Sequence, residues 1–427
     1  AATFYLPGLV VPMLPRSLSE GLVSLNPGVD RRALVFEVRL DLTGKVVRTE
    51  IHRGRVRSRV KTWYDAVQAY MDGQIPLPGG DPAVAESLAR LREVGELRME
   101  AADSREVVAI RRAEVAVSLA GQAGLRFVAM ADPRNAVEHY NEQISLLCNI
   151  EGALYLRRNA QDDDHVQPVY RVHDPPTPER LARLADTISS LARLHRLDPD
   201  QWRWVPGEQS LARYLEGLPV EGPNGRIARA IHRQVLMSTG AAAFATVPGR
   251  HHGIGADVYA RFTAPMREVV GVFVHKETWE KQAGFEPPPQ PGVPDDDTLR
   301  AEIVEASNHA RKLQRGLDHE ANRRVLDQLF SDDLARPHGE RPAHRGTVMG
   351  VSRDKVHVQL DDPPIDVKVY ARHLEKHRRD GPLRQGRDAL TLRRKKGNAR
   401  VATVGEAVRV QVAGRDRKRD RWRLILL

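Results

Sequence analysis

An arginine beside an apolar run is the first side chain whose type and position could do chemistry. Residues 260–275 read ARFTAPMREVVGVFVH, and Thr263 followed by Pro265 predicts a capped first turn of a helix that continues through the apolar run. Arg267 would then stand beside unpaired N–H groups of a helix N-terminus, where a positive charge is disfavoured by ~0.3–1 kcal/mol. A bound phosphate would satisfy both the N–H groups and the guanidinium. The spacing leaves two alternatives open, a phosphate site or an ordinary surface or ion-paired arginine.

Ligands for a metal ion are scarce in the sequence. The acidic runs are DDD at 162–164 and DDD at 295–297. Neither run stands in apolar sequence that would hold it rigidly, so both are expected in solvated loops, the second as the cap of the following helix. His251 and His252 are adjacent and share no helical face, so a zinc site is not expected. The single cysteine, Cys148, lies in SLLCNI and is expected to be a buried, unreactive thiol.

Aromatic residues are few, at 5% of the chain, and three of them are candidates for base stacking. The three candidates are Tyr5, Trp63 and Tyr64. The last two are at the end of the arginine-rich stretch RGRVRSRVKTWY. Aromatic rings beside cations stack and clamp the bases of single-stranded nucleic acid. Packing in a protein core is the alternative, and the pattern alone leaves it open.

Basic residues gather in the last fifth of the chain. Residues 341–427 hold 23 lysines and arginines against 10 aspartates and glutamates, whereas the preceding residues hold 43 against 46. A small region this basic is typical of a protein that meets a polyanion, most often nucleic acid. The alternative is a basic surface that is solvated and binds no polyanion.

Targeting signals are not apparent in the sequence. No run of 18 apolar residues occurs, so no transmembrane helix is expected. The first residues, AATFYLPGLVVPMLP, have no basic n-region and are interrupted by prolines, unlike a signal peptide. A single cysteine fits a reducing compartment. We therefore expect a cytoplasmic monomer, and the abrupt apolar beginning without Met suggests that the chain starts within a domain.

The elements that would position these residues have a mixed α+β pattern. At 427 residues the chain is expected to hold two or three domains. Alternation around a Thr-Gly turn predicts a hairpin within residues 33–60. Caps, N-terminal prolines and the spacing of apolar residues predict helices at 81–97, 135–157 and 177–195.

The pattern changes in the last third of the chain. FEPPPQPGVPDDD, residues 285–297, is expected to be an extended surface loop, and a polar helix is predicted over about 297–331. From residue 344 short strands follow one another in basic sequence, which predicts a small β-barrel of the OB-fold type.

Several stretches together resemble the ribonuclease II and ribonuclease R family. HHGIGADVYARFTAPMR, residues 251–267, resembles a signature in which H-x-G-L, a Tyr and F-T-S-P-I-R occur at this spacing without a gap. YLPGLVVPMLPRSLSEGLVSLNPGVDRRAL is similar to the stretch after the family's catalytic segment, and RSRVKTWYDAVQAY, NEQISLLCN and PVYRVHDPP follow in the family's order. The resemblance implies that residues 1–337 are a ribonuclease II-type catalytic domain without its N-terminal part. It also implies an OB-fold RNA-binding domain at residues 338–427.

Family resemblance implies a 3′→5′ exoribonuclease that hydrolyses single-stranded RNA to nucleoside 5′-monophosphates with a metal-activated water. By position, Arg267 matches the arginine that holds the scissile phosphate and stabilises its developing charge. Tyr5 matches a tyrosine that clamps the last nucleotide, and Tyr64 matches one near the 3′ end that helps to sense the sugar. Glu142 is the nearest acidic match to a glutamate of the ribose site, and Thr263 is assigned to RNA binding with its loop.

This sequence departs from the family pattern at two places that bear on activity. Glu268, Val269 and Gly271 stand where the family has a basic residue, an aromatic residue and an aspartate, and Ala264 replaces a serine. The family's catalytic aspartates have no match here, so Mg²⁺ is implied with ligands upstream of residue 1, and no metal ligand is assigned within the chain. A catalytically inactive RNA-binding homologue is therefore the alternative to an active exoribonuclease. A DNA-binding regulator is disfavoured because no helix-turn-helix signal occurs.

Overall fold

The computed structural model describes residues 1–104, 115–121, 126–131, 134–158, 166–284, 291–292, 294–378 and 381–427. Two compact units are present, each assembled from separate stretches of the chain. The first takes residues 1–107, 134–175 and 241–316, and the second takes residues 108–133, 176–240 and 317–427. In the described part, no helix is long and apolar enough to cross a membrane. The acidic run at 162–164 and most of the proline-rich connection lie outside the described residues.

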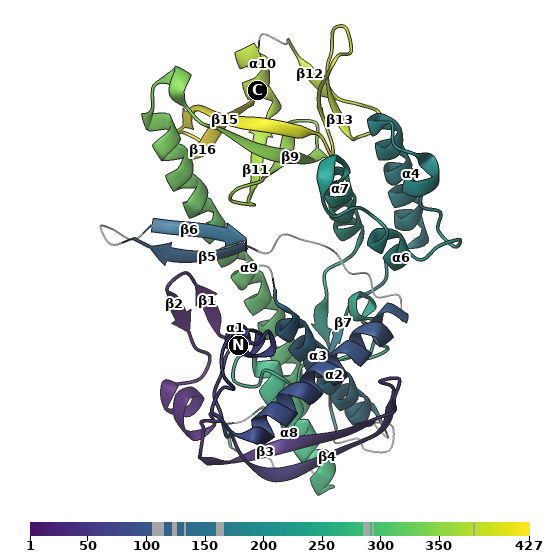
Figure 1. Ribbon diagram of the computed structural model, residues 1–427, viewed down its shortest axis with the longest axis vertical. Helices are drawn as coiled ribbons and strands as arrows, with labels where there is room; N and C mark the ends of the chain where they lie inside the picture. Colours follow the sequence, from purple (N-terminus) through teal and green to yellow (C-terminus); the bar gives the residue numbers. More distant parts are fainter. Residues whose placement is uncertain are drawn as a thin grey trace. The chain divides into compact units, whose positions relative to one another are not determined.

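The first unit consists of helices and two-stranded antiparallel pairs (Figure 1). Its elements are β1 (Phe4–Leu6), β2 (Leu9–Val11), the π-helix η1 (Ser17–Leu22), β3 (Asp30–Leu40), β4 (Val46–Arg57), α1 (Tyr64–Met71), α2 (Pro82–Ser104), α3 (Ala136–Arg157), β7 (Tyr170–Val172), β8 (Ala243–Ala245), the 3₁₀-helix η2 (His252–Ile254), α8 (Val269–Ala283) and the first part of α9 (Asp296–Ala335).

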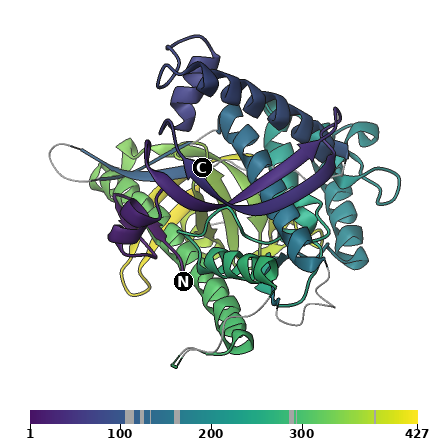
Figure 2. The ribbon, with the colours of Figure 1, turned by 90° about the horizontal axis from the view of Figure 1, so that it is seen from below.

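The long β3–β4 hairpin lies across the helices of the first unit (Figure 2). Its turn contains Gly44 at φ +74°, a conformation that favours glycine. Three polar contacts attach the hairpin to helices: Arg98 Nη1 of α2 donates to the Gly44 carbonyl at 2.9 Å, the Thr49 hydroxyl donates to Glu151 of α3 at 2.6 Å, and Gln282 Nε2 of α8 donates to the Ile51 carbonyl at 2.6 Å.

The core of the first unit joins α3 and α8 to the segment that contains the signature motif. Asn135 is the N-cap of α3. Its side chain accepts from the N–H of Glu138 while the Glu138 carboxylate accepts from the N–H of Asn135, a reciprocal capping box. Phe262 is 2% exposed and packs in this core. Cys148 packs against the same core, and burial raises the pKa of its thiol to about 12. The prediction of a thiol without reactivity is consistent with that pKa, because the thiolate is the nucleophile.

The second unit combines helices with antiparallel sheets (Figure 1). Its elements are β5 (Val115–Ala120), β6 (Arg126–Ala131), α4 (Pro178–His195), α5 (Pro199–Trp202), α6 (Leu211–Glu216), α7 (Gly222–Ser238), the remainder of α9, the 3₁₀-helix η3 (His338–Glu340), β9 (Ala343–Val351), β10 (Lys355–Leu360), β11 (Asp366–Tyr370), α10 (Ala371–Arg378), β12 (Leu383–Gln385), β13 (Thr391–Arg394), β14 (Arg400–Thr403), β15 (Ala407–Asp416) and β16 (Arg421–Leu426).

The basic C-terminal strands form sheets that are open in the described residues. A five-stranded sheet has the order β11-β10-β9-β15-β16, and β12, β13 and β14 form a separate three-stranded sheet. No strand ladder among the described residues joins β11 to β16, so the predicted closed barrel is not present as a single sheet. Sequence periodicity predicts strands but cannot specify which edges pair, because pairing depends on the turns and on tertiary packing. The division of the chain at residues 337 and 338 stays a prediction.

One hydrophobic core links the C-terminal sheets to the preceding helices. Buried residues of α4 and α7 pack with buried residues of β9, β10, β15 and β16 in one cluster. The alternation in β10, where every second side chain is buried, directs one face of the strand to that core. Removing residues 341–427 would therefore expose a core and would not isolate their contribution to RNA binding.

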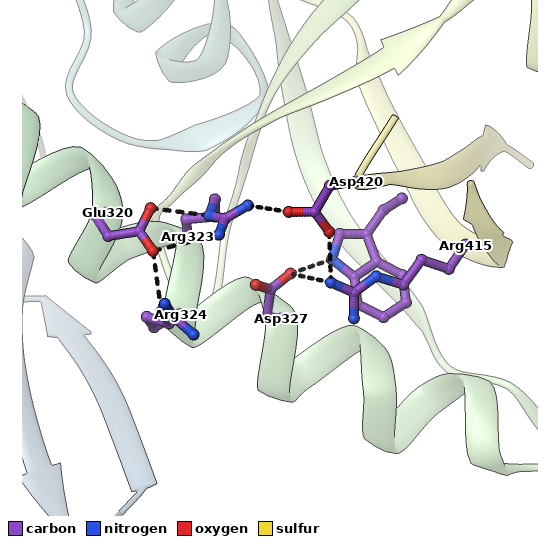
Figure 3. Close-up of polar contacts among 7 residues, drawn as sticks. Glu320, Arg323, Arg324, Asp327, Arg415 and Asp420 are labelled. Carbon is purple, nitrogen blue, oxygen red and sulfur yellow. Dashed lines mark hydrogen bonds and ion pairs between the residues drawn. The ribbon is translucent and has the colours of Figure 1, made fainter. Parts of the chain in front are cut away.

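A polar network fastens the β15–β16 turn to α9 within the second unit (Figure 3). Asp420 accepts from Arg323 at 2.6 Å and from Arg415 at 2.8 Å, and these contacts lower the pKa of its carboxyl. Trp422 Nε1 donates to Asp327 at 2.7 Å, while the Arg415 guanidinium lies 4.9 Å from the Trp422 ring centroid. The network fixes the tip of a hairpin that carries several arginines.

Most of the predicted helices and the first hairpin are confirmed. α2, α3 and α4 each begin one residue after the start of a predicted helix, and the Thr177 hydroxyl caps α4 by accepting from the Arg180 N–H. The predicted polar helix is α9, with bounds Asp296–Ala335. The expectation of a solvated loop is wrong for Asp296, whose side chain is 11% exposed because it bonds Lys276 of α8.

Candidate functional site

Asn149 of α3 organises the loop that carries the signature motif. Its side chain is fully buried, and its Oδ1 accepts from the backbone N–H groups of Phe262 and Thr263 at 2.7 and 3.1 Å. Its Nδ2 donates to the Tyr259 hydroxyl at 2.9 Å and to Thr263 Oγ1 at 3.1 Å. One side chain therefore fixes both the backbone and the side chains of the loop that precedes Arg267.

The helix after the motif begins later than the sequence predicts. α8 starts at Val269 with Glu268 as its N-cap, and no side chain caps it. Thr263 bonds Asn149 instead of capping α8, and Arg267 lies in the turn before the helix, where its N–H donates to the Ala264 carbonyl at 3.0 Å. The prediction of Arg267 in the first helical turn is wrong, because Asn149 and the packing of the loop hold residues 263–268 outside the helix.

Arg267 has an exposed side chain, and both its backbone N–H and its backbone carbonyl are hydrogen-bonded. Its carbonyl accepts from the Thr3 N–H at 2.8 Å, next to a bridge between Ala2 and Glu268. No hydrogen bond or ion pair forms between the Arg267 guanidinium and any residue that the structure describes. The described residues show no ion pair for Arg267, and the alternatives of a phosphate site and an ordinary surface arginine both stay predictions. A fixed backbone with a free guanidinium suits the capture of an external anion.

Glu268 and Gly271, two of the departures from the family pattern, both have structural roles. Glu268 Oε2 accepts from Arg261 Nε at 2.9 Å, and its Oε1 lies 3.6 Å from Arg311 Nη1 of α9. A Cβ at Gly271 would lie 2.8 Å from the Pro265 Cα, so the loop approaches α8 more closely than a larger residue allows. Glu268 binds the side chains around the loop, and Gly271 lets the loop pack on α8.

Replacing Asn149 by alanine is expected to lower the free energy of unfolding by about 2 kcal/mol, because a buried amide N–H is left without an acceptor. Chemical denaturation followed by circular dichroism measures the change. Asn141→Ala is the control, since the Asn141 side chain donates to the Tyr64 hydroxyl at 3.0 Å in an exposed setting and should change stability by less than about 0.5 kcal/mol. Equal stability of both variants would contradict the role of Asn149.

The three aromatic candidates are exposed. Tyr5, Trp63 and Tyr64 have exposed fractions of 46%, 69% and 45%, so they do not pack in a core. The backbone of Tyr5 is bound to Gln314 of α9 by hydrogen bonds of 3.1 and 2.9 Å. The Tyr64 hydroxyl accepts from Asn141 Nδ2 at 3.0 Å, which positions its ring at the start of α1. Exposed, positioned rings are the kind that bases can stack on.

The Glu142 carboxylate of α3 contacts two basic side chains. Its carboxylate accepts from Arg134 Nη1 at 3.1 Å and lies 3.8 Å from His139 Nδ1. Binding a ribose hydroxyl would require the carboxylate to share or exchange these partners. Its assignment to the ribose site stays a prediction.

Carboxylates converge at one place in the described residues, but a lysine lies among them. Glu277, Glu280 and Asp296 offer oxygens within 4.8 Å of one another. Lys276 Nζ lies 3.2 Å from Glu277, 2.7 Å from Glu280 and 2.5 Å from Asp296. The Lys276 ammonium group contacts all three carboxylates and compensates their negative charge, in the place that a metal ion would occupy. These residues therefore do not fit a metal ion. The site is an internal ion network.

The second unit presents basic side chains around two cavities. One, of ≈ 890 Å³, is lined in part by Arg323, Lys368 and Arg421, and Tyr370 borders it. The guanidinium groups of Arg372 and Arg421 each lie 5.1 Å from the Tyr370 ring centroid. The other, of ≈ 730 Å³, is lined by residues that include three arginines of the β15–β16 hairpin, Arg415, Arg417 and Arg423. Arginine next to aromatic rings is a pattern found in proteins that bind single-stranded nucleic acid.

Sequence reasoning identified Arg267 but missed the side chains that hold its loop. Asn149 falls within the quoted NEQISLLCN stretch, yet an asparagine on an apolar helix face has no spacing signal of its own. Arg171 and Arg311 come from distant segments, and nothing in the sequence indicates that they approach Arg261. A buried polar residue on an otherwise apolar face is the one signal that could have indicated Asn149, because buried polar groups need partners.

Comparisons with known proteins place the chain in a family. The RNB domain model matches residues 1–280. Exoribonuclease 2 of Yersinia enterocolitica serotype O:8 / biotype 1B is 28% identical over 364 residues, which are 85% of this chain and 52% of that protein. The chain thus spans about half the length of that relative.

Solved structures extend the likeness to the fold. Mycoplasma genitalium RNase R in complex with ribose-methylated single-stranded RNA matches with a TM-score of 0.84 and 20% identity, over 100% of this chain and 62% of that one. Yeast Ssd1, a pseudonuclease, matches with a TM-score of 0.62 and 13% identity, over 96% and 45% of the two chains. Since the RNB model covers more than half of the residues, including the loop built around Asn149, the chain belongs to the RNB domain family.

Proposed function

We propose that this chain is the part of a 3′→5′ exoribonuclease that binds the 3′ end of single-stranded RNA. The observation that carries the proposal is the Arg267 guanidinium, which is free among the described residues on a loop fixed by Asn149 and Thr3. Membership of the RNB family and the likeness to exoribonuclease 2 support it. The RNA in the complex of Mycoplasma genitalium RNase R suggests single-stranded RNA as the ligand.

Within this proposal, the residues of the first unit bind and orient the RNA end. Arg267 donates hydrogen bonds to the scissile phosphate and stabilises the negative charge that grows on its oxygens as the phosphodiester breaks. Tyr5 stacks on the last base, and Tyr64 contacts the sugar near the 3′ end. Thr263 and Glu142 complete the assigned RNA contacts. The products are nucleoside 5′-monophosphates.

Mg²⁺ is part of the proposal only through the family resemblance. That resemblance implies that the metal supplies an activated water, with aspartate ligands upstream of residue 1. The carboxylates that converge in the described residues bind Lys276 instead. We therefore assign no step to residues 277, 280 and 296.

The basic side chains of the second unit are proposed to bind RNA upstream of the cleaved end. They are exposed along the β15–β16 turn at Arg417, Lys418 and Arg419. Contacts of this kind act on phosphates and are sequence-independent, so binding should weaken steeply as salt rises. The OB-fold assignment of residues 338–427 and the cytoplasmic, monomeric state belong to the same proposal.

An RNA-binding homologue without cleavage is the second candidate. It is supported by the likeness in fold to yeast Ssd1, a pseudonuclease. Both candidates predict RNA binding, and they differ in cleavage.

Incubation of 5′-labelled single-stranded RNA with the natural protein that contains this chain, with and without Mg²⁺, separates the two candidates. We expect a ladder of products shortened from the 3′ end that requires Mg²⁺. RNA that is bound tightly but never shortened would support the homologue without cleavage. Absence of both binding and cleavage would overturn the proposal and its alternative together.

A further inference from the structure

We infer that Arg171, Arg261 and Arg311 form a second phosphate-binding site, distinct from Arg267, for the backbone of single-stranded RNA. The inference rests on the proposed function, because it assigns an additional contact to the same substrate. All three side chains belong to the first unit and come from β7, the signature segment and α9.

The guanidinium of Arg171 is the unusual member of the group. Its Nε is buried and has no hydrogen-bond partner, and none of its side-chain nitrogens bonds an acceptor among the described residues. Its Cζ lies 5.8 Å from the centroid of the Phe244 ring, on the neighbouring strand β8. Burial and the charge of Arg311 lower the pKa of Arg171 to about 10. A guanidinium in this setting gains strongly from an anion, because a buried charge without a partner is costly.

The surrounding charges do not compensate Arg171. Glu268 is the only carboxylate among the described residues that pairs with this group, and it is shared by Arg261 and Arg311. His251 is neutral near pH 7 and cannot compensate a positive charge: burial is the main cause that lowers its pKa to about 4, and Arg171 adds to the shift. Three guanidinium groups and one carboxylate therefore leave an excess of two positive charges.

The backbone around the arginines is fixed before any ligand binds. Arg171 N–H donates to the Tyr259 carbonyl at 2.8 Å, which joins β7 to the signature segment. The Tyr259 hydroxyl accepts from Asn149 Nδ2 at 2.9 Å and from Arg261 Nη1 at 3.4 Å. Arg261 keeps 26% of its side chain exposed and Arg311 keeps 37%, so the group is open to solvent. A preorganised cationic group open to solvent is suited to phosphate oxygens.

The position of the group favours an RNA phosphate over a free anion. Arg261 and Arg267 lie on one loop, and Glu268, which binds Arg261, directly follows Arg267. The site therefore lies close along the chain to the arginine assigned to the scissile phosphate. A polynucleotide that reaches Arg267 can place another of its phosphates at Arg171.

The experiment measures the binding of a 5′-fluorescein-labelled oligouridylate by fluorescence anisotropy, in EDTA to prevent cleavage and over a range of KCl concentrations. Arg171→Gln is expected to weaken binding about tenfold, as for the loss of a hydrogen bond to a charged group. The slope of log K against log salt should fall by about 0.7, the value for one phosphate of a single strand. Arg90→Gln is the control, because Arg90 lies on α2, is 67% exposed and pairs with Glu93; it should leave both quantities unchanged.

A second variant separates RNA binding from a structural role. Arg171→Met keeps the aliphatic stem against Phe244 and removes the charge. Its melting temperature without RNA should equal or exceed that of the unchanged protein, while its RNA affinity falls as for Arg171→Gln. A lower melting temperature with normal affinity, or unchanged affinity in both variants, would overturn the site while leaving the proposed function intact. Failure of the unchanged protein to bind RNA would instead contradict the proposed function, and the inferred site with it.

Discussion

Arg267→Ala is expected to lower the cleavage rate of single-stranded RNA by at least about tenfold while RNA binding is largely retained. The physical reason is that the growing charge on the scissile phosphate is larger in the transition state than in bound RNA. A donor on a fixed loop therefore contributes more to the reaction step than to binding. Single-turnover cleavage and anisotropy binding, measured on the same RNA, give the two quantities separately.

Two further variants sharpen the Arg267 result. Arg267→Lys keeps the charge but loses the paired donors, so it should restore only part of the rate, because a lysine cannot bind phosphate oxygens bidentately. Arg90→Ala, on the exposed face of α2, should cleave at the unchanged rate. Equal losses of binding and of cleavage in Arg267→Ala would reduce Arg267 to a docking contact.

Lys276→Met is expected to lower the free energy of unfolding by about 3 kcal/mol at pH 8, because removal of one partner leaves buried carboxylates without compensating charge. Glu277 and Glu280 are fully buried, and Asp296 is nearly so. Denaturant unfolding measures the loss. Lys312→Met is the control, since Lys312 is exposed on α9 and has no ion pair among the described residues; it should change stability by less than about 0.5 kcal/mol.

The pH dependence gives the Lys276 prediction a distinct signature. Burial is the main cause that raises the pKa of Glu277 to about 7, while Lys276 opposes the shift. A carboxyl with a raised pKa contributes stability that is fully present below its unfolded pKa and is lost as pH rises through the folded value. Without Lys276 the carboxylates hold protons more tightly, so the deficit of the variant should shrink from pH 8 to pH 5.5. A deficit that is independent of pH would contradict this account.

Local sequence patterns determined most of the helices and the first hairpin. The cap and proline before α4 and the asparagine before α3 act within a few residues, so they can be recognised without knowledge of the fold. The motif around Arg267 is likewise contiguous, which is why the family and the candidate arginine could be predicted from sequence. The prediction that Arg267 binds an RNA phosphate came from the family resemblance. The spacing of the residues alone did not distinguish a phosphate site from an ordinary surface or ion-paired arginine.

Tertiary structure decided where α8 begins, how the C-terminal strands pair and which charges are compensated. Hydrogen bonds with Asn149 keep the loop that contains Thr263 outside α8. The contact with Lys276 buries most of the Asp296 side chain, which was expected in a solvated loop. These contacts join residues far apart in the chain, and their strength depends on burial, which removes competing water. Sequence by itself determined the local elements and the family signature, because both reside in neighbouring residues. The unpaired guanidinium of Arg171 became visible only in the folded chain, since burial and the lack of a counter-ion are properties of its surroundings in space.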